Sequence, residues 1–385
     1  NKTKKIKGTL DLKDVKWTLN KKKQINENFK IGDVIFVKQQ KNSWSIKQYP
    51  KVNGGIIVLD PFNGDIKALV GGFNFKSSEF NRVTQAKRQP GSAFKPIVYA
   101  AALENGFSPN SIILDAPFVE SQGEGLKYWK PENYGKKFYG PSTFRKGIEY
   151  SRNLMTIRIA KMLGLKKVLD LSKKLEIYDE IPELLSVSLG AAETTLLNLT
   201  AAYAPFVNGG KKIEPNLISR IQDRRGKTIF QVENRKCNGC KNFINQSNVL
   251  PEIINTNDQV ISEETAYQMT SILTGAVKRG TAKKLKHLKV PLAGKTGTTN
   301  ENFDAWFIGY SSNLVIGVYI GFDNPKTLGK YETGSKAALP IFKHFIENSL
   351  YKEDFKDFKI PKNILLTSLN YDTGKKSSTR DKNVI

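Results

Sequence analysis

The stretch that decides the fold begins with a break in the chain and continues as an apolar helix. Residues 88–103 read Arg88-Gln89-Pro90-Gly91-Ser92-Ala93-Phe94-Lys95-Pro96-Ile97-Val98-Tyr99-Ala100-Ala101-Ala102-Leu103. Pro90 and Gly91 interrupt regular structure just before Ser92, and the residues that follow are apolar nearly all round. A helix that is apolar on every side is a buried one. The stretch therefore predicts a buried central helix with Ser92 at its N-terminus.

Strand patterns lie on both sides of this helix. Residues 56–60 and 66–70 flank an Asn63-Gly64 turn, which is a strong signal for a β-hairpin. Residues 305–310 and 314–322 flank a short polar turn and predict a second hairpin. Apolar residues at helical spacing fall between the hairpins, in residues 93–104, 154–163, 195–207 and 263–277. Strands at both ends with helices between them predict an α+β domain, an antiparallel sheet with helices packed on it.

The composition excludes several classes of protein. Of the 385 residues, 39% are hydrophobic and 25% are charged, which is typical of a globular protein and not of a disordered chain, a collagen or a coiled coil. The net charge of +25 suits either a binder of polyanions or a lysine-rich solvated surface. No nucleic-acid motif is present, so we favour the solvated surface and expect no nucleic-acid partner. The lysine-rich residues 1–50 are where we expect contact with any anionic partner.

The context of the histidines and the length of the apolar runs exclude further classes of protein. The two histidines, His287 and His344, stand in no metal-ligand spacing, so we expect no metal, no cofactor and a catalytic base other than imidazole. The longest apolar run, residues 314–322, is too short to span a bilayer. The chain starts at Asn1 with no signal segment, so we expect any membrane anchor to lie upstream.

Three short motifs occur in order along the chain. They are Ser92-Ala93-Phe94-Lys95, Ser151-Arg152-Asn153 and Lys295-Thr296-Gly297-Thr298. Each alone is weak in a lysine-rich chain, but all three in this order are far more specific for serine acyl transfer. The alternative is that the serines only cap helices and that the glycine only makes a turn.

The chemistry of the first motif follows from helix geometry. Residues three apart share a helix face, so Lys95 lies over Ser92. The helix N-terminus favours developing negative charge, and the Ser92 N–H would form half of an oxyanion hole. Lys95 is the predicted base, which requires that its pKa fall by about 3 units, through burial and a second nearby cation.

The other two motifs supply the remaining roles. Lys295 is the predicted second cation, which would also attract a substrate carboxylate. Ser151 would relay a proton between the lysines and the leaving group, and Asn153 would hold Lys95 and the substrate amide. Residues 295–299 read as a strand, and its predicted substrate-binding residues are Thr296, Gly297, Thr298 and Thr299. The N–H of Thr298 would complete the oxyanion hole.

These motifs and their surroundings resemble class A penicillin-binding proteins over about residues 52–350. The resemblance rests on residues 80–82, 85–86 and 88–96, Pro131-Glu132-Asn133-Tyr134, residues 139–141, 151–153, 189–190, 201–203, 208–210, 280–281, 294–300 and 304–307. It implies the penicilloyl-serine transferase fold, with an antiparallel sheet flanked by helices and an all-helical subdomain. It also implies a partial OB-like β module at 1–50, a penicillin-binding transpeptidase domain at 51–366 and a polar tail at 367–385.

The function that the resemblance implies is a D,D-transpeptidase that cross-links peptidoglycan. Its partners would be donor and acceptor stem peptides, and β-lactam antibiotics would acylate Ser92. The family's membrane helix and glycosyltransferase domain are not in this sequence, so we assign no glycan polymerisation. The implied location is the periplasmic face of the inner membrane, which is oxidising, and a disulfide between Cys237 and Cys240 is therefore expected.

Two other functions share the same motifs. A D,D-carboxypeptidase would hydrolyse the same acyl-enzyme, because water and an amine compete for it. A non-catalytic penicillin-binding sensor would keep Ser92 but would need no acceptor groove. A class A β-lactamase is disfavoured, because neither Glu183 nor Glu193 stands in an E-x-x-L-N pattern.

Overall fold

The described part of the chain forms two compact units. A computed structural model describes all residues except 1–6, 20–28, 40–42, 122, 124, 126, 233–234, 239–251, 349–355 and 378–382. The units comprise Asn1–Lys51 and Val52–Ile385. The first contains α1 (Leu12–Val15), the 3-10 turn η1 (Lys16–Thr18) and an antiparallel pair, β1 (Phe36–Gln39) with β2 (Trp44–Lys47). Val15 and Ile46 are its buried apolar side chains among the described residues.

The second unit is built on one five-stranded antiparallel sheet in the order β11-β12-β13-β3-β4. The strands are β3 (Asn53–Leu59), β4 (Ile66–Val70), β11 (Ala293–Thr298), β12 (Ala305–Tyr310) and β13 (Val315–Gly321). Both predicted hairpins are present, as β3–β4 and β12–β13. Because β13 pairs with β3, strands from the two ends of the unit meet at the centre of the sheet.

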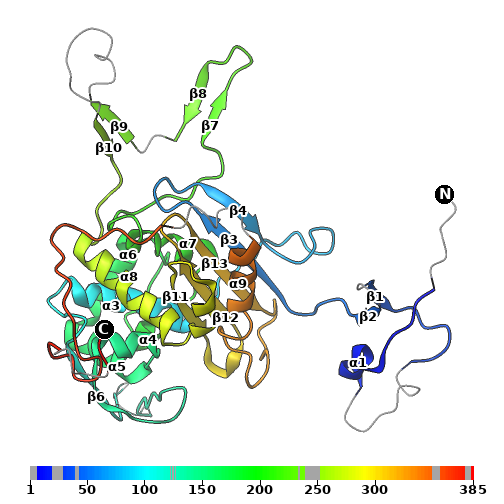
Figure 1. Cartoon of the computed structure of the whole chain (residues 1–385), viewed down its shortest axis with the longest axis horizontal. Coiled ribbons are helices and arrows are strands. Elements are labelled where there is room, and N and C mark those ends of the chain that lie inside the picture. Colours follow the sequence, from blue (N-terminus) through cyan, green and yellow to red (C-terminus); the bar gives the residue numbers. More distant parts are fainter. Residues whose placement is uncertain are drawn as a thin grey trace. The chain divides into compact units, whose positions relative to one another are not determined.

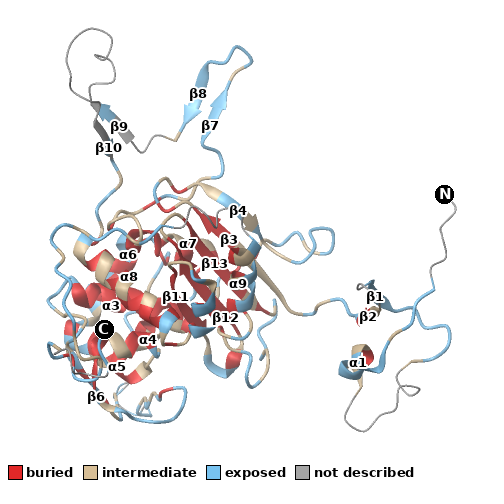
Figure 2. Cartoon of the chain, in the orientation of Figure 1, coloured by how far each residue is buried: buried red, intermediate tan, exposed pale blue. Residues whose placement is uncertain are grey.

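Helices cover both faces of this sheet, so its central strands are buried on both sides (Figures 1 and 2). On β12, Trp306 and Ile308 join the large core formed with α3, α5 and α8, whereas Phe307 packs on the opposite side. There the ring centroid of Phe307 lies 4.8 Å from that of Phe342 on α9 (Leu339–Asn348). This alternation follows from the period of two of a β-strand. The predicted α+β architecture is confirmed.

Besides α9, the helices of the second unit include the four that the apolar spacing predicts and others that it does not predict. They are η2 (Gly91–Phe94), α3 (Lys95–Leu103), α4 (Phe144–Glu149), α5 (Asn153–Leu163), α6 (Leu165–Lys174), η3 (Leu185–Leu189), α7 (Leu196–Ala201), η4 (Ala204–Phe206), α8 (Glu263–Lys278), η6 (Lys283–Leu288) and η7 (Asn300–Asn302). All nine residues of α3 are buried. The predicted helix over 195–207 is divided into α7 and η4, because Pro205 has no N–H to continue a helix.

Short two-stranded pairs and the C-terminal residues complete the unit. The pairs are β5 (Ile112–Asp115) with β6 (Gly140–Thr143), β7 (Arg220–Gln222) with β8 (Thr228–Gln231), and β9 (Arg235–Asn238) with β10 (Glu252–Asn255). The sequence predicts a separate polar tail over 367–385. In the structure the tail turns back on itself, with two hydrogen bonds between Leu369 and Ile385, and its Tyr371 contacts α4. A tyrosine supplies both a ring and a hydroxyl for such a contact. The polar composition of the tail therefore gave no indication that Tyr371 would make it.

Candidate active site

Ser92 occupies a turn that close backbone packing holds in place. It lies in η2 and is half-buried, while the residues on either side of it are buried. Gly91 has a φ of +52°, and a Cβ there would lie 2.5 Å from the carbonyl oxygen of Thr298. A Cβ on Gly297 would lie 2.4 Å from the Pro90 carbonyl oxygen. These glycines therefore allow strand β11 to lie directly against the turn that carries Ser92.

Lys95, the first residue of α3, points its ammonium group at the second motif. Its Nζ donates to the Ser151 carbonyl oxygen at 2.7 Å and to Asn153 Oδ1 at 2.6 Å, and it lies 3.4 Å from Ser151 Oγ. The side chain is completely buried. Burial first and the Lys295 charge second lower the pKa of Lys95 well below its usual value, against an opposing effect of Asp115.

Lys295 approaches the same hydroxyl from strand β11. Its Nζ donates to Ser151 Oγ at 2.8 Å and to the Thr296 carbonyl oxygen at 2.9 Å. Burial lowers the pKa of Lys295 to about 7. Ser151 has a φ of +57°, a backbone conformation that is strained for a serine. The Ser151 hydroxyl thus lies between two buried amines, where it is able to pass a proton from one to the other.

The predicted substrate-binding residues lie on β11 and just beyond its end. Thr296 Oγ1 donates to Thr281 Oγ1 at 3.0 Å, and Thr298 Oγ1 accepts from the Gly334 N–H at 3.0 Å. Thr299 Oγ1 accepts from the Asp304 N–H at 2.9 Å, which closes the turn into β12. A hydroxyl that accepts an N–H keeps its own proton as a donor. Thr298 and Thr299 therefore retain the capacity to donate to a bound anion.

Two residues to which the sequence assigned no role, Asn133 and Asp115, support the Ser151-Arg152-Asn153 motif. Asn133 is buried, and its Oδ1 accepts from the backbone N–H groups of Asn153 at 2.8 Å and Leu154 at 3.3 Å. Its Nδ2 donates to Asp115 Oδ1 at 2.8 Å. The residue at the N-cap of α5 is Arg152, whose side chain makes no capping hydrogen bond. A helix start without a capping side chain is the signal that would have pointed to an acceptor elsewhere in the chain.

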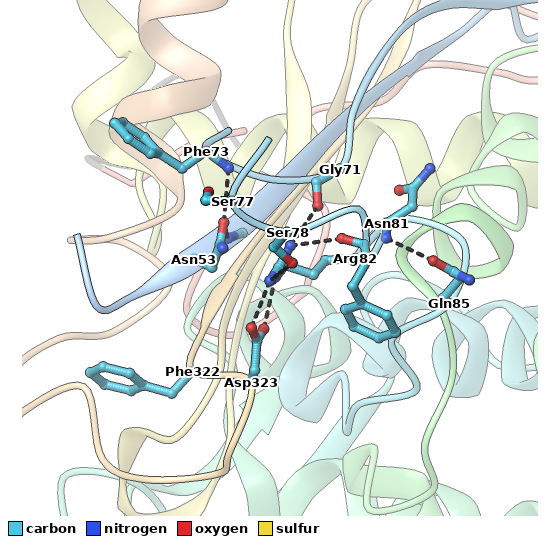
Figure 3. Close-up of polar contacts among 12 residues, drawn as sticks. Asn53, Gly71, Phe73, Ser77, Ser78, Asn81, Arg82, Gln85, Phe322 and Asp323 are labelled. Carbon is cyan, nitrogen blue, oxygen red and sulfur yellow. Dashed lines mark hydrogen bonds and ion pairs between the residues drawn. The ribbon is translucent and has the colours of Figure 1, made fainter. Parts of the chain in front are cut away.

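A buried arginine anchors the chain upstream of Ser92 (Figure 3). Arg82 Nε and Nη2 donate to the two carboxylate oxygens of Asp323, at 2.7 and 2.6 Å. Its Nη1 donates to the carbonyl oxygens of Gly71 and Phe80, and its Nη2 also donates to Ser78 Oγ. The guanidinium group therefore ties the loop that precedes Ser92 to the end of β13, in the bidentate geometry that strengthens such pairs.

The predicted cysteine pair lies only partly within the described residues. Cys237 is an exposed residue of β9, and Cys240 lies outside the described residues, so the disulfide between them stays a prediction. Within the ranges that the structure describes, no group of three or more His, Cys, Asp or Glu residues is placed to hold a metal ion. Among those same residues, no helix has the length and apolarity needed to cross a membrane.

The fold and motif geometry match one family of proteins. The family of penicillin-binding protein transpeptidase domains matches residues 54–347, which are more than half of the chain, and this chain belongs to that family. The family of penicillin-binding protein OB-like domains matches residues 3–52. The resemblance to penicillin-binding proteins that the motifs indicate is therefore confirmed.

Individual relatives agree with this assignment. The chain is 43% identical over 373 residues to penicillin-binding protein 1A of Rickettsia conorii, a match that covers 96% of this chain and 47% of the relative. It is 36% identical to the Pseudomonas aeruginosa protein of the same name, over 90% of this chain and 46% of the relative. The crystal structure of penicillin-binding protein 1A from Haemophilus influenzae superposes with a TM-score of 0.80 at 33% identity, over 92% of this chain and 56% of that one. The chain thus spans about half the length of the relatives it matches.

Proposed function

We propose that the second unit is a D,D-transpeptidase that cross-links peptidoglycan stem peptides through an acyl-enzyme on Ser92. The observation that carries the proposal is the position of the Ser151 hydroxyl, 2.8 Å from the Lys295 amine and 3.4 Å from the Lys95 amine. Two lysines with lowered pKa values around one serine hydroxyl suit repeated proton transfer without histidine.

Acylation would begin with Ser92 as the nucleophile. Neutral Lys95 takes the Ser92 proton as the serine oxygen bonds to the carbonyl carbon of the penultimate D-alanine. The N–H groups of Ser92 and Thr298 would stabilise the oxyanion. The carbon–nitrogen bond then breaks, and the departing D-alanine amine receives a proton through Ser151. The products are an ester on Ser92 and free D-alanine.

Transfer would reverse the direction of proton flow. The amine of a neighbouring stem peptide attacks the ester carbon and gives up one proton through Ser151 to the neutral Lys95. The ester bond to Ser92 breaks, and the serine oxygen recovers its proton from Lys95. Atoms and charges balance, because one amide is lost and one is formed.

The donor's terminal carboxylate would bind at β11. Protonated Lys295 supplies a positive charge beside the strand, and Thr298 and Thr299 supply hydroxyl donors. A β-lactam carries a carboxylate and a strained amide, so the same groups would direct it to Ser92. The family of the chain and the names of its relatives support this ligand, and they support a cell-wall role outside the cytoplasm at the periplasmic face of the membrane.

Two measurements test the proposal. A fluorescent penicillin should label the wild-type chain covalently, and Ser92→Ala should abolish the label. A label that survives this substitution would remove Ser92 from the mechanism. Mass spectrometry of a mixture of the chain, a stem-peptide donor and an amine acceptor should then detect the cross-linked product. Trimmed donor without cross-linked product would support a D,D-carboxypeptidase, and a label without any turnover would support a sensor.

A further inference from the structure

Glu149 is a buried acid that the proposed mechanism does not use. It is the last residue of α4, two residues before Ser151, and its side chain is completely buried. Its carboxylate accepts from Arg279 Nη2 at 2.6 Å and Nε at 3.1 Å. The Tyr371 hydroxyl donates to Oε2 at 2.6 Å, and Arg145 Nη1 lies 3.8 Å away. A buried carboxylate persists only when such partners satisfy it.

The backbone of Glu149 also meets the segment that leads to β11. Its carbonyl oxygen accepts from the Thr281 N–H at 3.1 Å, and Thr281 Oγ1 accepts from Thr296 Oγ1 at 3.0 Å. A Cβ on Gly280 would lie 2.1 Å from that carbonyl oxygen, and one on Gly275 would lie 1.8 Å from Glu149 Oε1. The two glycines permit α8 and the residues after it to lie directly against Glu149. One residue therefore connects the loop of Ser151 with the strand of Lys295.

Tyr371 brings the C-terminal tail into this junction. Its ring lies under two cations, with Arg279 4.9 Å and Lys146 4.8 Å from the ring centroid. Nearby, Asn110 Nδ2 donates to the Gly374 carbonyl oxygen at 3.0 Å, which fixes the turn after Tyr371. The tail is therefore held by ring contacts to Lys146 of α4 and to Arg279, by the hydrogen bond from Asn110, and by one hydroxyl that reaches the buried carboxylate of Glu149.

We propose that Glu149 is a positioning residue for Ser151 and that the Tyr371 hydroxyl of the tail completes the hydrogen bonding of the Glu149 carboxylate. This inference rests on the proposed acylation of Ser92. The strained backbone of Ser151 has to be held by its surroundings, and Glu149, two residues away, is a buried group that is tied both to Arg279 at the end of α8 and to the tail. When the Tyr371 hydroxyl is removed, Glu149 Oε2 loses one hydrogen bond and keeps the one from Arg279 Nε. The end of α4 and the Ser151 hydroxyl then gain freedom to move.

The test uses Tyr371→Phe, which removes the hydroxyl and keeps the ring. Stopped-flow kinetics with a β-lactam separate the dissociation constant of the non-covalent complex from the rate constant of Ser92 acylation. We expect the acylation rate constant to fall roughly tenfold, the lower end of the effect of one lost hydrogen bond to a charged group. The dissociation constant should stay within about twofold, because the hydroxyls on β11 are unchanged. Glu149→Gln, which keeps the shape and removes the charge, should give the same pattern more strongly.

The matched control is Asp372→Asn in the same tail. Asp372 pairs with Lys146 on α4 at an exposed position, a contact that does not reach Glu149. We expect the control to acylate at the wild-type rate. Equal rates in Tyr371→Phe and wild type would overturn the inference alone, and so would an equal loss in Asp372→Asn. A wild-type chain that penicillin does not acylate would overturn the proposed function and this inference with it.

Discussion

The amine of Lys295 and the hydroxyl of Ser151 lie 2.8 Å apart, although 144 residues separate them in the chain. The contact forms because β11 is an edge strand of the central sheet, and Ser151 stands in the loop between α4 and α5. Both lysines around this hydroxyl are buried, and burial lowers the pKa of Lys295 to about 7 and the pKa of Lys95 well below its usual value.

The buried state of Lys295 makes the stability of the protein depend on pH. Burial lowers the pKa of Lys295 to about 7 in the folded chain, whereas an unfolded lysine titrates near 10.4. Between these values the unfolded chain binds a proton that the folded chain does not. The free energy of unfolding should therefore rise with pH in this window, by up to about 1.4 kcal/mol per unit for this group. Thermal unfolding between pH 7 and 9 measures the slope.

Lys295→Met should reduce that slope, since the substituted side chain does not titrate. The control is Lys278→Met, which replaces an exposed lysine at the end of α8. It should leave the slope as in wild type. Identical slopes in wild type and Lys295→Met would show that Lys295 is not held neutral in the folded protein.

The rate of penicillin acylation should depend on pH through the protonation of Lys95 and Lys295. Lys95 is the proposed base, and burial with the Lys295 charge lowers its pKa, so the rate should rise with pH as Lys95 loses its proton. Lys295 loses its charge as pH rises through about 7, so attraction for the ligand carboxylate should then weaken and the rate should fall. Lys295→Arg keeps the charge and should remove the alkaline fall. A rate that does not fall as pH rises through about 7 would contradict the assignment of Lys295.

Gly297→Ala should slow acylation without unfolding the domain. The added Cβ would lie 2.4 Å from the Pro90 carbonyl oxygen and 2.9 Å from the Ala93 Cβ, so β11 would have to move away from the turn that carries Ser92. A displacement of this kind costs roughly tenfold to a hundredfold in rate. Gly135→Ala is the matched control, because a Cβ there meets no atom within 4 Å. Wild-type acylation by Gly297→Ala would mean that the close approach has no part in placing Ser92.

Asn133→Asp should destabilise the domain and slow acylation together. The substitution keeps an oxygen for the start of α5 but removes the donor to Asp115, and it places two carboxylates side by side in a buried site. We expect a loss of about 1–3 kcal/mol in the free energy of unfolding. Asn105→Asp is the comparison, because that exposed side chain makes a single hydrogen bond to the Ala101 carbonyl oxygen. Equal stability of the two variants would contradict the support role of Asn133.

Features that depend on neighbouring residues are predictable from the sequence alone. The turn at Asn63-Gly64 and the alternation around it predict the β3–β4 hairpin, which the structure contains. The apolar run after Ser92 predicts a buried helix, and every residue of α3 is buried. The three motifs were visible because each is short and contiguous, and their order indicated the family. Local periodicity and short motifs are properties of the linear chain, so no tertiary information was needed.

Only the tertiary structure decided which distant groups touch. Asn133 caps α5 across 20 residues, and Tyr371 reaches Glu149 across 222. Neither pair has a spacing that marks it in the sequence. The same holds for the lowered pKa of Lys295, which depends on how completely strand, loop and helix exclude water from its amine. Burial and long-range hydrogen bonds arise only when the whole domain packs. The motifs therefore predict which groups react, and the fold sets the protonation of these groups and the distances between them.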